Sequence, residues 1–247
     1  MTPPAPPPEP GAFDAARRET VRYHEELYAS TALGQPGSWL ARPHRLLRDA
    51  LGRVQGRGPV VAYDLGAGIG RHTVPMLRAL PPGSEVYAVD LLPSALERLA
   101  AAVPPELRGG LHLRAADLDA YELEAPADLV LAFSALEHLP GRAAVGRALA
   151  RVRGAMRPGG VVAVGIVADR VEVDADGTSR PARVETALTA AEAQDLLDRA
   201  FRGFTVESSD ASTASVREER GGAAHTLTST LVTRVATAPP DPVAPQG

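Results

Sequence analysis

The sequence has no cysteine, no lysine and no asparagine, so all 26 of its basic side chains are arginine. Without cysteine there can be no disulfide, no thiolate ligand for a metal and no thiol nucleophile. Without lysine there is no Schiff-base amine and no phosphate-binding lysine of the P-loop kind. Abundant alanine, arginine, glycine and proline beside these gaps reflect GC-rich coding. The missing residue types exclude certain functions, but they do not indicate which function the protein has.

Strong charge and long apolar runs are missing as well. A formal net charge of −4 gives no electrostatic reason to expect a nucleic-acid partner. The longest apolar stretches, such as 161–167, are far shorter than the roughly 20 residues that span a membrane. The first ten residues carry neither the basic nor the apolar region of a signal peptide. We therefore expect a soluble, cytoplasmic protein with no membrane partner.

Composition divides the chain into four parts. Proline crowds both ends, and residues 1–11 and 238–247 are predicted to be disordered tails because they have few apolar groups to bury. Residues 12–58 contain two segments with helical patterning, 12–28 and 39–55, and are predicted to form an N-terminal helical lid. Residues 59–237 are predicted to form one α/β domain.

Within residues 59–237, short apolar runs alternate with helical patterns. Strands are predicted at 60–64, 85–89, 111–115, 127–133, 161–167, 204–208 and 226–235, and helices at 71–80, 93–103, 142–156 and 189–201. This alternation predicts βαβ units and a Rossmann-like, doubly wound, mostly parallel sheet. Thr189 and Glu192 form a capping-box pattern at the start of the last helix. Asp176-Gly177 is a hairpin turn signal.

A glycine-rich loop follows the first predicted strand, in the stretch Asp64-Leu65-Gly66-Ala67-Gly68-Ile69-Gly70. Glycines let the backbone approach a ligand closely. The dinucleotide fingerprint G-x-G-x-x-G would place its third glycine at position 71, but here it comes one residue earlier. A carboxylate at Asp64 would repel a pyrophosphate, whereas it suits the sulfonium and ammonium groups of S-adenosylmethionine. The loop favours this ligand over NAD.

These residues resemble the class I S-adenosylmethionine-dependent methyltransferases. The first motif of that family, [DE]-x-G-x-G-x-G, is matched by Asp64, Gly66, Gly68 and Gly70. The resemblance covers about residues 60–167 and implies seven strands, the last antiparallel. It implies that Asp90, after the second strand, binds the ribose hydroxyls and that Asp117, after the third, lies near the adenine amino group. The other positions that it places at the cofactor are Ala67, Leu91, Leu118 and Phe133.

The N-terminal segments 23–28 and 37–43 are similar to small bacterial methyltransferases of the tellurite-resistance type. That similarity implies helices that cover the cofactor and help to shape the acceptor pocket. Trp39 and Tyr28 are candidates for contact with the sulfonium by cation–π attraction, or else anchors for helix packing. We expect the other walls of the pocket to come from 134–140, 169–189 and a polar connection at 208–225.

Two histidines are candidates for a general base. His138 follows the fourth strand, on the edge where the methyl group should point, and its alternative role is to hold the loop. His24 is the second candidate. A base is needed only if the acceptor must lose a proton, since methyl transfer is an in-line displacement that depends mainly on alignment.

Further absences narrow the reaction. The segment after the fourth strand lacks the [DN]-P-P-[YFW] motif of enzymes that methylate amino groups of bases or glutamine. No asparagine is present for a catechol-type metal site, and no metal site is predicted. We expect metal-independent transfer to a small-molecule acceptor in secondary metabolism. The alternatives are an NAD(P)-dependent oxidoreductase and a non-catalytic, S-adenosylmethionine-binding partner subunit.

Overall fold

The computed structural model describes residues 11–182, 184–220 and 223–241, so the expected tails lie largely outside the described residues. The helices are α1 (Ala12–Ser30), α2 (Arg45–Val54), α3 (Thr73–Ala79), α4 (Pro93–Ala102), α5 (Arg142–Ala155) and α6 (Ala190–Ala200), with 3-10 turns η1 (Trp39–Ala41), η2 (Pro105–Gly110) and η3 (Leu136–His138). The strands are β1 (Val61–Leu65), β2 (Glu85–Asp90), β3 (Leu111–Ala115), β4 (Ala127–Phe133), β5 (Met156–Asp174), β6 (Ser179–Pro181), β7 (Thr205–Arg220) and β8 (Ala223–Thr237). In the described part of the chain no helix combines the length and apolarity that crossing a membrane requires.

The strands form one sheet in the order β3-β2-β1-β4-β5-β8-β7, and β6 pairs with β5 outside this path. Strands β1 to β5 are mutually parallel, while β8 runs antiparallel to both β5 and β7. The predicted Rossmann-like sheet with an antiparallel last strand is confirmed. Residues of β1 and β4 are buried on both faces, which explains why these strands read as continuous apolar runs.

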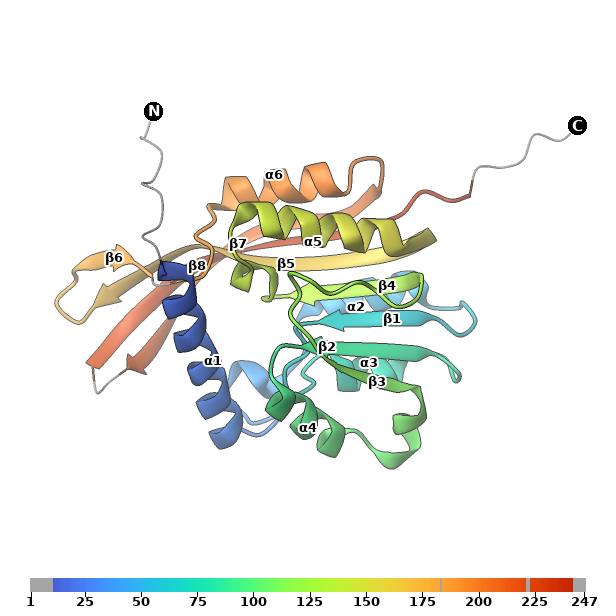
Figure 1. The fold of residues 1–247 in the computed structure, drawn as a ribbon, viewed down its shortest axis with the longest axis horizontal. Helices are drawn as coiled ribbons and strands as arrows, with labels where there is room; N and C mark the ends of the chain where they lie inside the picture. Colours follow the sequence, from blue (N-terminus) through green and yellow to red (C-terminus); the bar gives the residue numbers. More distant parts are fainter. Residues whose placement is uncertain (1–10, 183, 221–222, 242–247) are drawn as a thin grey trace, which may run out of the picture.

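Helices cover both faces of the sheet (Figure 1). One apolar cluster joins α5 and α6 to one face, and a second joins α2, α3 and α4 to the other. Helix α2 buries Leu46, Leu47, Ala50 and Val54, so it belongs to the layer that packs on the sheet. Of the two helices expected in the lid, only α1 lies across the edge where β1 to β4 end (Figure 1).

The single helix expected over 39–55 is instead two elements. The first, η1, ends at Ala41, and α2 begins at Arg45. Pro43 separates them because its ring removes a backbone donor and disfavours a helical conformation in the preceding residue. The His44 side chain caps α2 by accepting a hydrogen bond from the Leu46 amide at 3.3 Å.

Strand β8 lies where a strand was expected at 226–235, but β7 continues to Arg220 and corrects the prediction of a polar loop at 208–225. Strands β7 and β8 continue outward as a ribbon that extends beyond the helical layers (Figure 1). Serine and threonine pair across it, with Ser215 and Thr228 hydroxyls 2.8 Å apart. Because residues 209–217 of β7 are exposed, this part of the strand carries little hydrophobic alternation in the sequence. Strand β5 likewise continues to Asp174 and turns at Gly177 into β6.

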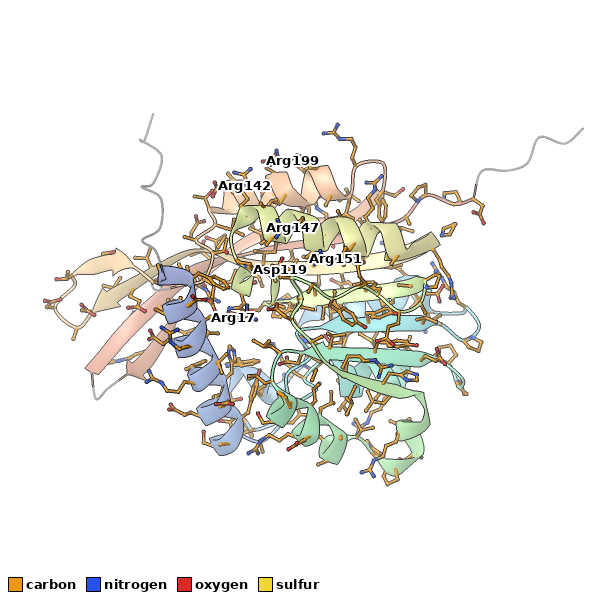
Figure 2. The ribbon with its side chains drawn as sticks, viewed as in Figure 1. Arg17, Asp119, Arg142, Arg147, Arg151 and Arg199 are labelled. Atoms are coloured by element: carbon orange, nitrogen blue, oxygen red, sulfur yellow. The ribbon has the colours of Figure 1, made fainter. Side chains whose placement is uncertain are left out.

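Arginines join the elements around the sheet (Figure 2). Arg142 of α5 donates to Glu192 at 3.0 Å and to Asp195 of α6 at 2.6 Å. The predicted capping box of α6 is present. Pairing also continues beyond the boundary expected at 237, because the Ala238 amide donates to Gly160 at 2.8 Å.

Candidate active site

The glycine loop links β1 to α3 at the carboxyl edge of the sheet. Gly66 and Gly68 both have positive φ, at 81° and 52°. A Cβ atom on Gly68 would lie 2.7 Å from the Tyr28 hydroxyl oxygen. The loop therefore needs glycine at this position both for its backbone conformation and for the close approach of α1.

Asp64 lies beneath this loop at the end of β1, with 1% of its surface exposed. The Thr73 hydroxyl donates to its carboxylate at 2.6 Å. Burial, with a smaller contribution from the charge of Asp90, raises the pKa of Asp64 to about 7. Asp64 thus supports the loop from below and does not line the pocket.

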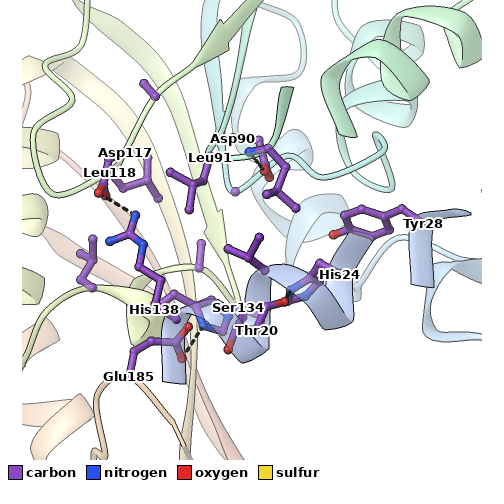
Figure 3. A pocket seen from close by; sticks show the side chains of 17 residues that line it. Thr20, His24, Tyr28, Asp90, Leu91, Asp117, Leu118, Ser134, His138 and Glu185 are labelled. Carbon is purple, nitrogen blue, oxygen red and sulfur yellow. Dashed lines mark hydrogen bonds and ion pairs between the residues drawn. The ribbon is translucent and has the colours of Figure 1, made fainter. Parts of the chain in front are cut away.

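Asp90 ends β2 and lines the pocket (Figure 3). Its two carboxylate oxygens accept hydrogen bonds from the Gly68 amide at 2.7 Å and from the Leu92 amide at 2.9 Å. Burial raises the pKa of Asp90, and these two amides act in the opposite direction. A single carboxylate thus joins the glycine loop to the start of α4 and still presents lone pairs to the pocket.

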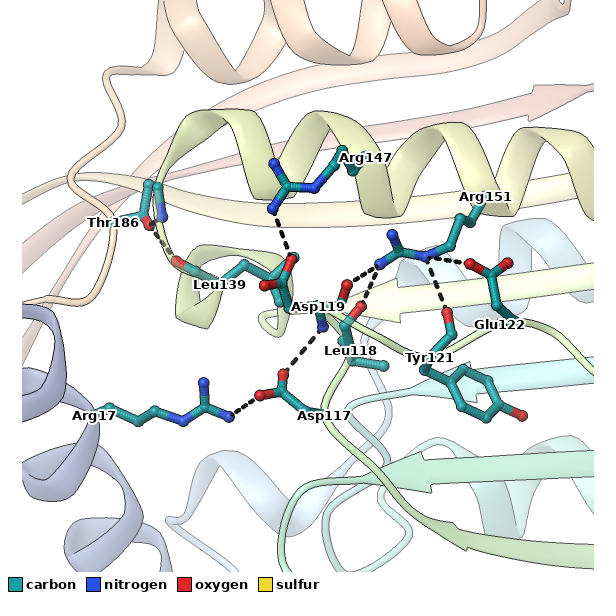
Figure 4. Close-up of polar contacts among 11 residues, drawn as sticks. Arg17, Asp117, Leu118, Asp119, Tyr121, Glu122, Leu139, Arg147, Arg151 and Thr186 are labelled. Atoms are coloured by element: carbon teal, nitrogen blue, oxygen red, sulfur yellow. Dashed lines mark hydrogen bonds and ion pairs between the residues drawn. The ribbon is translucent and has the colours of Figure 1, made fainter.

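Asp117 follows β3 and receives a hydrogen bond from Arg17 of α1 at 2.6 Å (Figure 4). The loop that carries it is fixed from α5, where Arg151 donates to the carbonyl oxygens of Leu118 at 2.7 Å and Asp119 at 2.8 Å. Arg147 donates to the Asp119 carboxylate at 3.1 Å. The ion pair between Arg17 and Asp117 therefore ties the lid helix to a rigidly held loop.

One face of α1 forms a wall of the pocket. It contributes Arg17, Thr20, Val21, His24 and Tyr28. These positions are three or four residues apart, which places them along a single face of the helix. Burial raises the pKa of the Tyr28 hydroxyl, so this group stays protonated beside Gly68.

The far end of the pocket brings together two histidines and a glutamate. Glu185 accepts a hydrogen bond from Nδ1 of His138, 3.1 Å from its Oε2. Nδ1 of His24 lies 2.9 Å from the Thr20 carbonyl oxygen, and the two imidazole centroids are 5.9 Å apart. Burial, with the charge of His138, lowers the pKa of His24 to about 4. His24 is therefore neutral at ordinary pH.

The structure brings most of the sequence-predicted site residues into one pocket. Its lining contains these predicted residues: His24, Tyr28, Gly66, Asp90, Leu91, Asp117, Leu118 and His138. Ala67, Gly68 and Gly70 belong to the same loop as Gly66 but are not among the lining residues.

Trp39 and Phe133 lie outside the pocket, against expectation. Trp39 is 44% exposed and its ring stacks with the guanidinium of Arg71, 5.5 Å away. Phe133 points to the face of the sheet that α2 covers, with its centroid 4.6 Å from that of His44. Alternation along β4 explains this placement, because successive side chains of a strand point to opposite faces.

Other lining residues were not predicted individually. They are Arg17, Thr20, Val21, Leu92, Ala116, Ser134, Ala135, Leu139 and Glu185. The helical spacing from Arg17 to Tyr28 could have identified the residues on α1. The expected walls at 134–140 and 169–189 do contribute to the lining, whereas none of the described side chains of 208–217 does.

Comparison with known proteins agrees with this geometry. Residues 63–162 match the model of a family described as a methyltransferase domain. TehB from Haemophilus influenzae is 14% identical to this chain, with a TM-score of 0.59. The matched region covers 87% of this chain and 66% of TehB. A SAM-dependent methyltransferase from Methanosarcina mazei is 14% identical with a TM-score of 0.54, covering 81% of this chain and 100% of its own. The glycopeptide N-methyltransferase MtfA is 22% identical with a TM-score of 0.51, covering 83% and 96%. No curated protein sequence matches the chain.

Proposed function

We propose that this chain, which carries a class I S-adenosylmethionine-dependent methyltransferase domain, transfers the methyl group of that cofactor to a small-molecule acceptor. S-adenosylmethionine is the cofactor of the domain. The observation that carries the proposal is the pocket at the carboxyl edge. It unites the acids after β2 and β3, the glycine loop after β1, and a base candidate after β4.

The residues present fit the cofactor. A positively charged ligand with ribose hydroxyls and an adenine amino group needs hydrogen-bond acceptors, and Asp90 and Asp117 supply them on adjacent strands. Gly66 brings backbone into the pocket wall, while Asp64 adds a carboxyl group beneath the loop. When bound, S-adenosylmethionine supplies a methyl group on a positively charged sulfur.

The shape of the pocket supports a small acceptor. The space between its walls is about 700 Å³ when the solvent at its open mouth is included. Helix α1 crosses above it, so a macromolecular acceptor would have to displace this helix.

The protein contributes to the reaction mainly by alignment. Helix α1 and the segment Ser134–Leu139 hold the acceptor against the glycine-loop side of the pocket and keep water away, which favours in-line attack. His138 removes a proton where the acceptor must lose one. We propose no metal in this step.

Calorimetry and product analysis test the proposal. We expect S-adenosylhomocysteine to bind and NAD to show no heat of binding. Mass spectrometry of reactions with candidate acceptors should then show products heavier by one methylene. Tight NAD binding without a response to S-adenosylhomocysteine would favour the oxidoreductase. Cofactor binding with no product from any acceptor would favour a partner subunit.

A further inference from the structure

Glu185, His138 and His24 meet at the end of the pocket that lies away from Asp117 (Figure 3). They come from the segment before α6, from η3 and from α1. We propose, resting on the methyl transfer above, that this end is the acceptor subsite and that it takes a protonated amine. Glu185 and His24 accept N–H bonds from the amine, and His138 receives its proton.

Glu185 provides the charge of the subsite. Its side chain is 1% exposed and lines the pocket. Oε2 is bonded to His138, but Oε1 is buried and has no donor in hydrogen-bonding geometry among the described residues. Burial alone would raise the pKa of Glu185, but His138 and the Thr20 hydroxyl outweigh it and hold the pKa at about 2. The carboxylate has two protein donors close by, His138 and Thr20, but its Oε1 makes no hydrogen bond of good geometry with the described residues. A ligand that donates would complete its hydrogen bonding.

The carboxylate also sets the orientation of His138. An ionised carboxylate only accepts hydrogen bonds, so Nδ1 of His138 carries the proton in this contact. Nε2 is then the nitrogen with the free lone pair. A histidine held in this way is oriented to take a proton from a group in the pocket.

His24 adds a second acceptor. Its Nδ1 donates to the Thr20 carbonyl oxygen, which leaves a lone pair on Nε2. Its lowered pKa keeps the ring uncharged. The rings of His24 and His138 meet edge to face at 85°. A ligand between them and Glu185 therefore meets hydrogen-bond acceptors on several sides.

The charges nearby distinguish an amine from an alcohol. Arg17, the arginine in the lining, is engaged by Asp117, and Arg170 pairs with the buried Glu137 at 3.6 Å. Neither guanidinium neutralises Glu185 in the described ion pairs. An ammonium group carries a positive charge and more than one N–H donor, whereas an alcohol offers a single O–H and no charge. The subsite therefore favours the amine.

The proposed step balances as follows. Nε2 of His138 takes one proton from the ammonium group, which frees the nitrogen lone pair. That lone pair forms a bond to the methyl carbon while the carbon–sulfur bond breaks and its electrons remain on sulfur. The products are the N-methylated ammonium ion, S-adenosylhomocysteine and a protonated His138, which releases its proton to water.

Binding of n-butylammonium to the S-adenosylhomocysteine complex tests the subsite without turnover. In NMR spectra of the histidine rings, we expect saturable shifts of His138 and His24 with n-butylammonium and none with n-butanol at equal concentration. Glu185→Gln should weaken the amine about tenfold or more, because it removes the charge from the hydrogen bond. Glu122→Gln is the matched control, since Glu122 is 77% exposed and lies outside the pocket lining.

Retained S-adenosylhomocysteine affinity and thermal stability will show that Glu185→Gln is folded. Equal shifts with n-butanol, no saturable shift with the amine, or unchanged amine affinity in Glu185→Gln would each overturn the proposal. If the wild-type protein does not bind S-adenosylhomocysteine, the methyltransferase function itself is refuted. Turnover of amines paired with alcohols of the same carbon skeleton adds a second readout, where O-methylation alone contradicts the amine assignment.

Discussion

The two ends of the pocket are built in different ways. At the cofactor end, acids stand at or just beyond the ends of strands and are held by nearby backbone, as Asp90 is by the Leu92 amide and Asp117 by the Asp119 amide. At the acceptor end, His138 and Glu185 are 47 positions apart and meet only through the fold. The residues of the cofactor end can therefore be identified from a local sequence motif. The acceptor end can change without disturbing that motif.

The largest expected effect tests whether the cofactor end depends on Asp90. Asp90→Ala leaves the Gly68 and Leu92 amides without their acceptor and removes the ribose-binding group, so S-adenosylhomocysteine affinity should fall by about 1000-fold. Calorimetry measures this loss. Glu97→Ala, which removes an exposed acid of α4 outside the pocket lining, should bind normally. A loss below tenfold in Asp90→Ala would contradict the assigned role.

The second prediction tests whether the Asp64 carboxyl group beneath the glycine loop is protonated in the folded protein. Because the pKa of Asp64 is raised to about 7, the folded protein keeps a proton that the unfolded chain loses near pH 4. This group therefore lowers the free energy of unfolding as pH rises through that interval. Asp64→Asn has no proton to lose and can still accept from Thr73. Relative to wild type, it should gain up to about 2.7 kcal/mol between pH 5 and 7.

Urea unfolding of both proteins at pH 5, 6 and 7 provides the measurement. A constant difference between wild type and Asp64→Asn across that range would show that Asp64 is ionised throughout. The cofactor end would then hold one more negative charge before the cofactor arrives.

A smaller effect is expected from breaking the Arg17–Asp117 ion pair, which joins helix α1 to the cofactor end of the pocket. Arg17 and Asp117 are partly exposed, at 23% and 38%, and such pairs contribute at most about 1 kcal/mol. Arg17→Gln should therefore raise the dissociation rate of S-adenosylhomocysteine about three- to fivefold in stopped-flow experiments. Arg22→Gln on the same helix, where Arg22 is 69% exposed, is the control. Equal rates in both variants would mean that the ion pair does not hold α1 down.

The smallest effect is expected at Trp39. Since its ring is half exposed and outside the pocket lining, Trp39→Ala should change S-adenosylhomocysteine affinity by less than about twofold. Calorimetry again measures it. A tenfold loss would restore Trp39 as a cofactor contact and would extend the cofactor end to η1.

The sequence predicts the central sheet and the acids that end its strands, because both depend on local patterns. Asp90 and Asp117 occupy the expected strand ends, and the Thr189 capping box is confirmed. Glu185 could not be assigned individually, since no spacing relates it to His138. Phe133 was misplaced because its side of β4 depends on strand alternation. The continuation of β7 beyond residue 208 was missed because serine and threonine supply its pairing without apolar burial.

Helix α1 is one unbroken element of 19 residues that contacts both ends of the pocket, with Arg17 at Asp117 and His24 beside His138. Movement of the whole helix away from the sheet edge would uncover both ends of the pocket together. If α1 swings aside, spent cofactor and methylated product gain their exit in the same excursion. Cofactor binding and product release would then both require the same movement of α1. The rate of that movement would set an upper limit on the number of catalytic cycles per second.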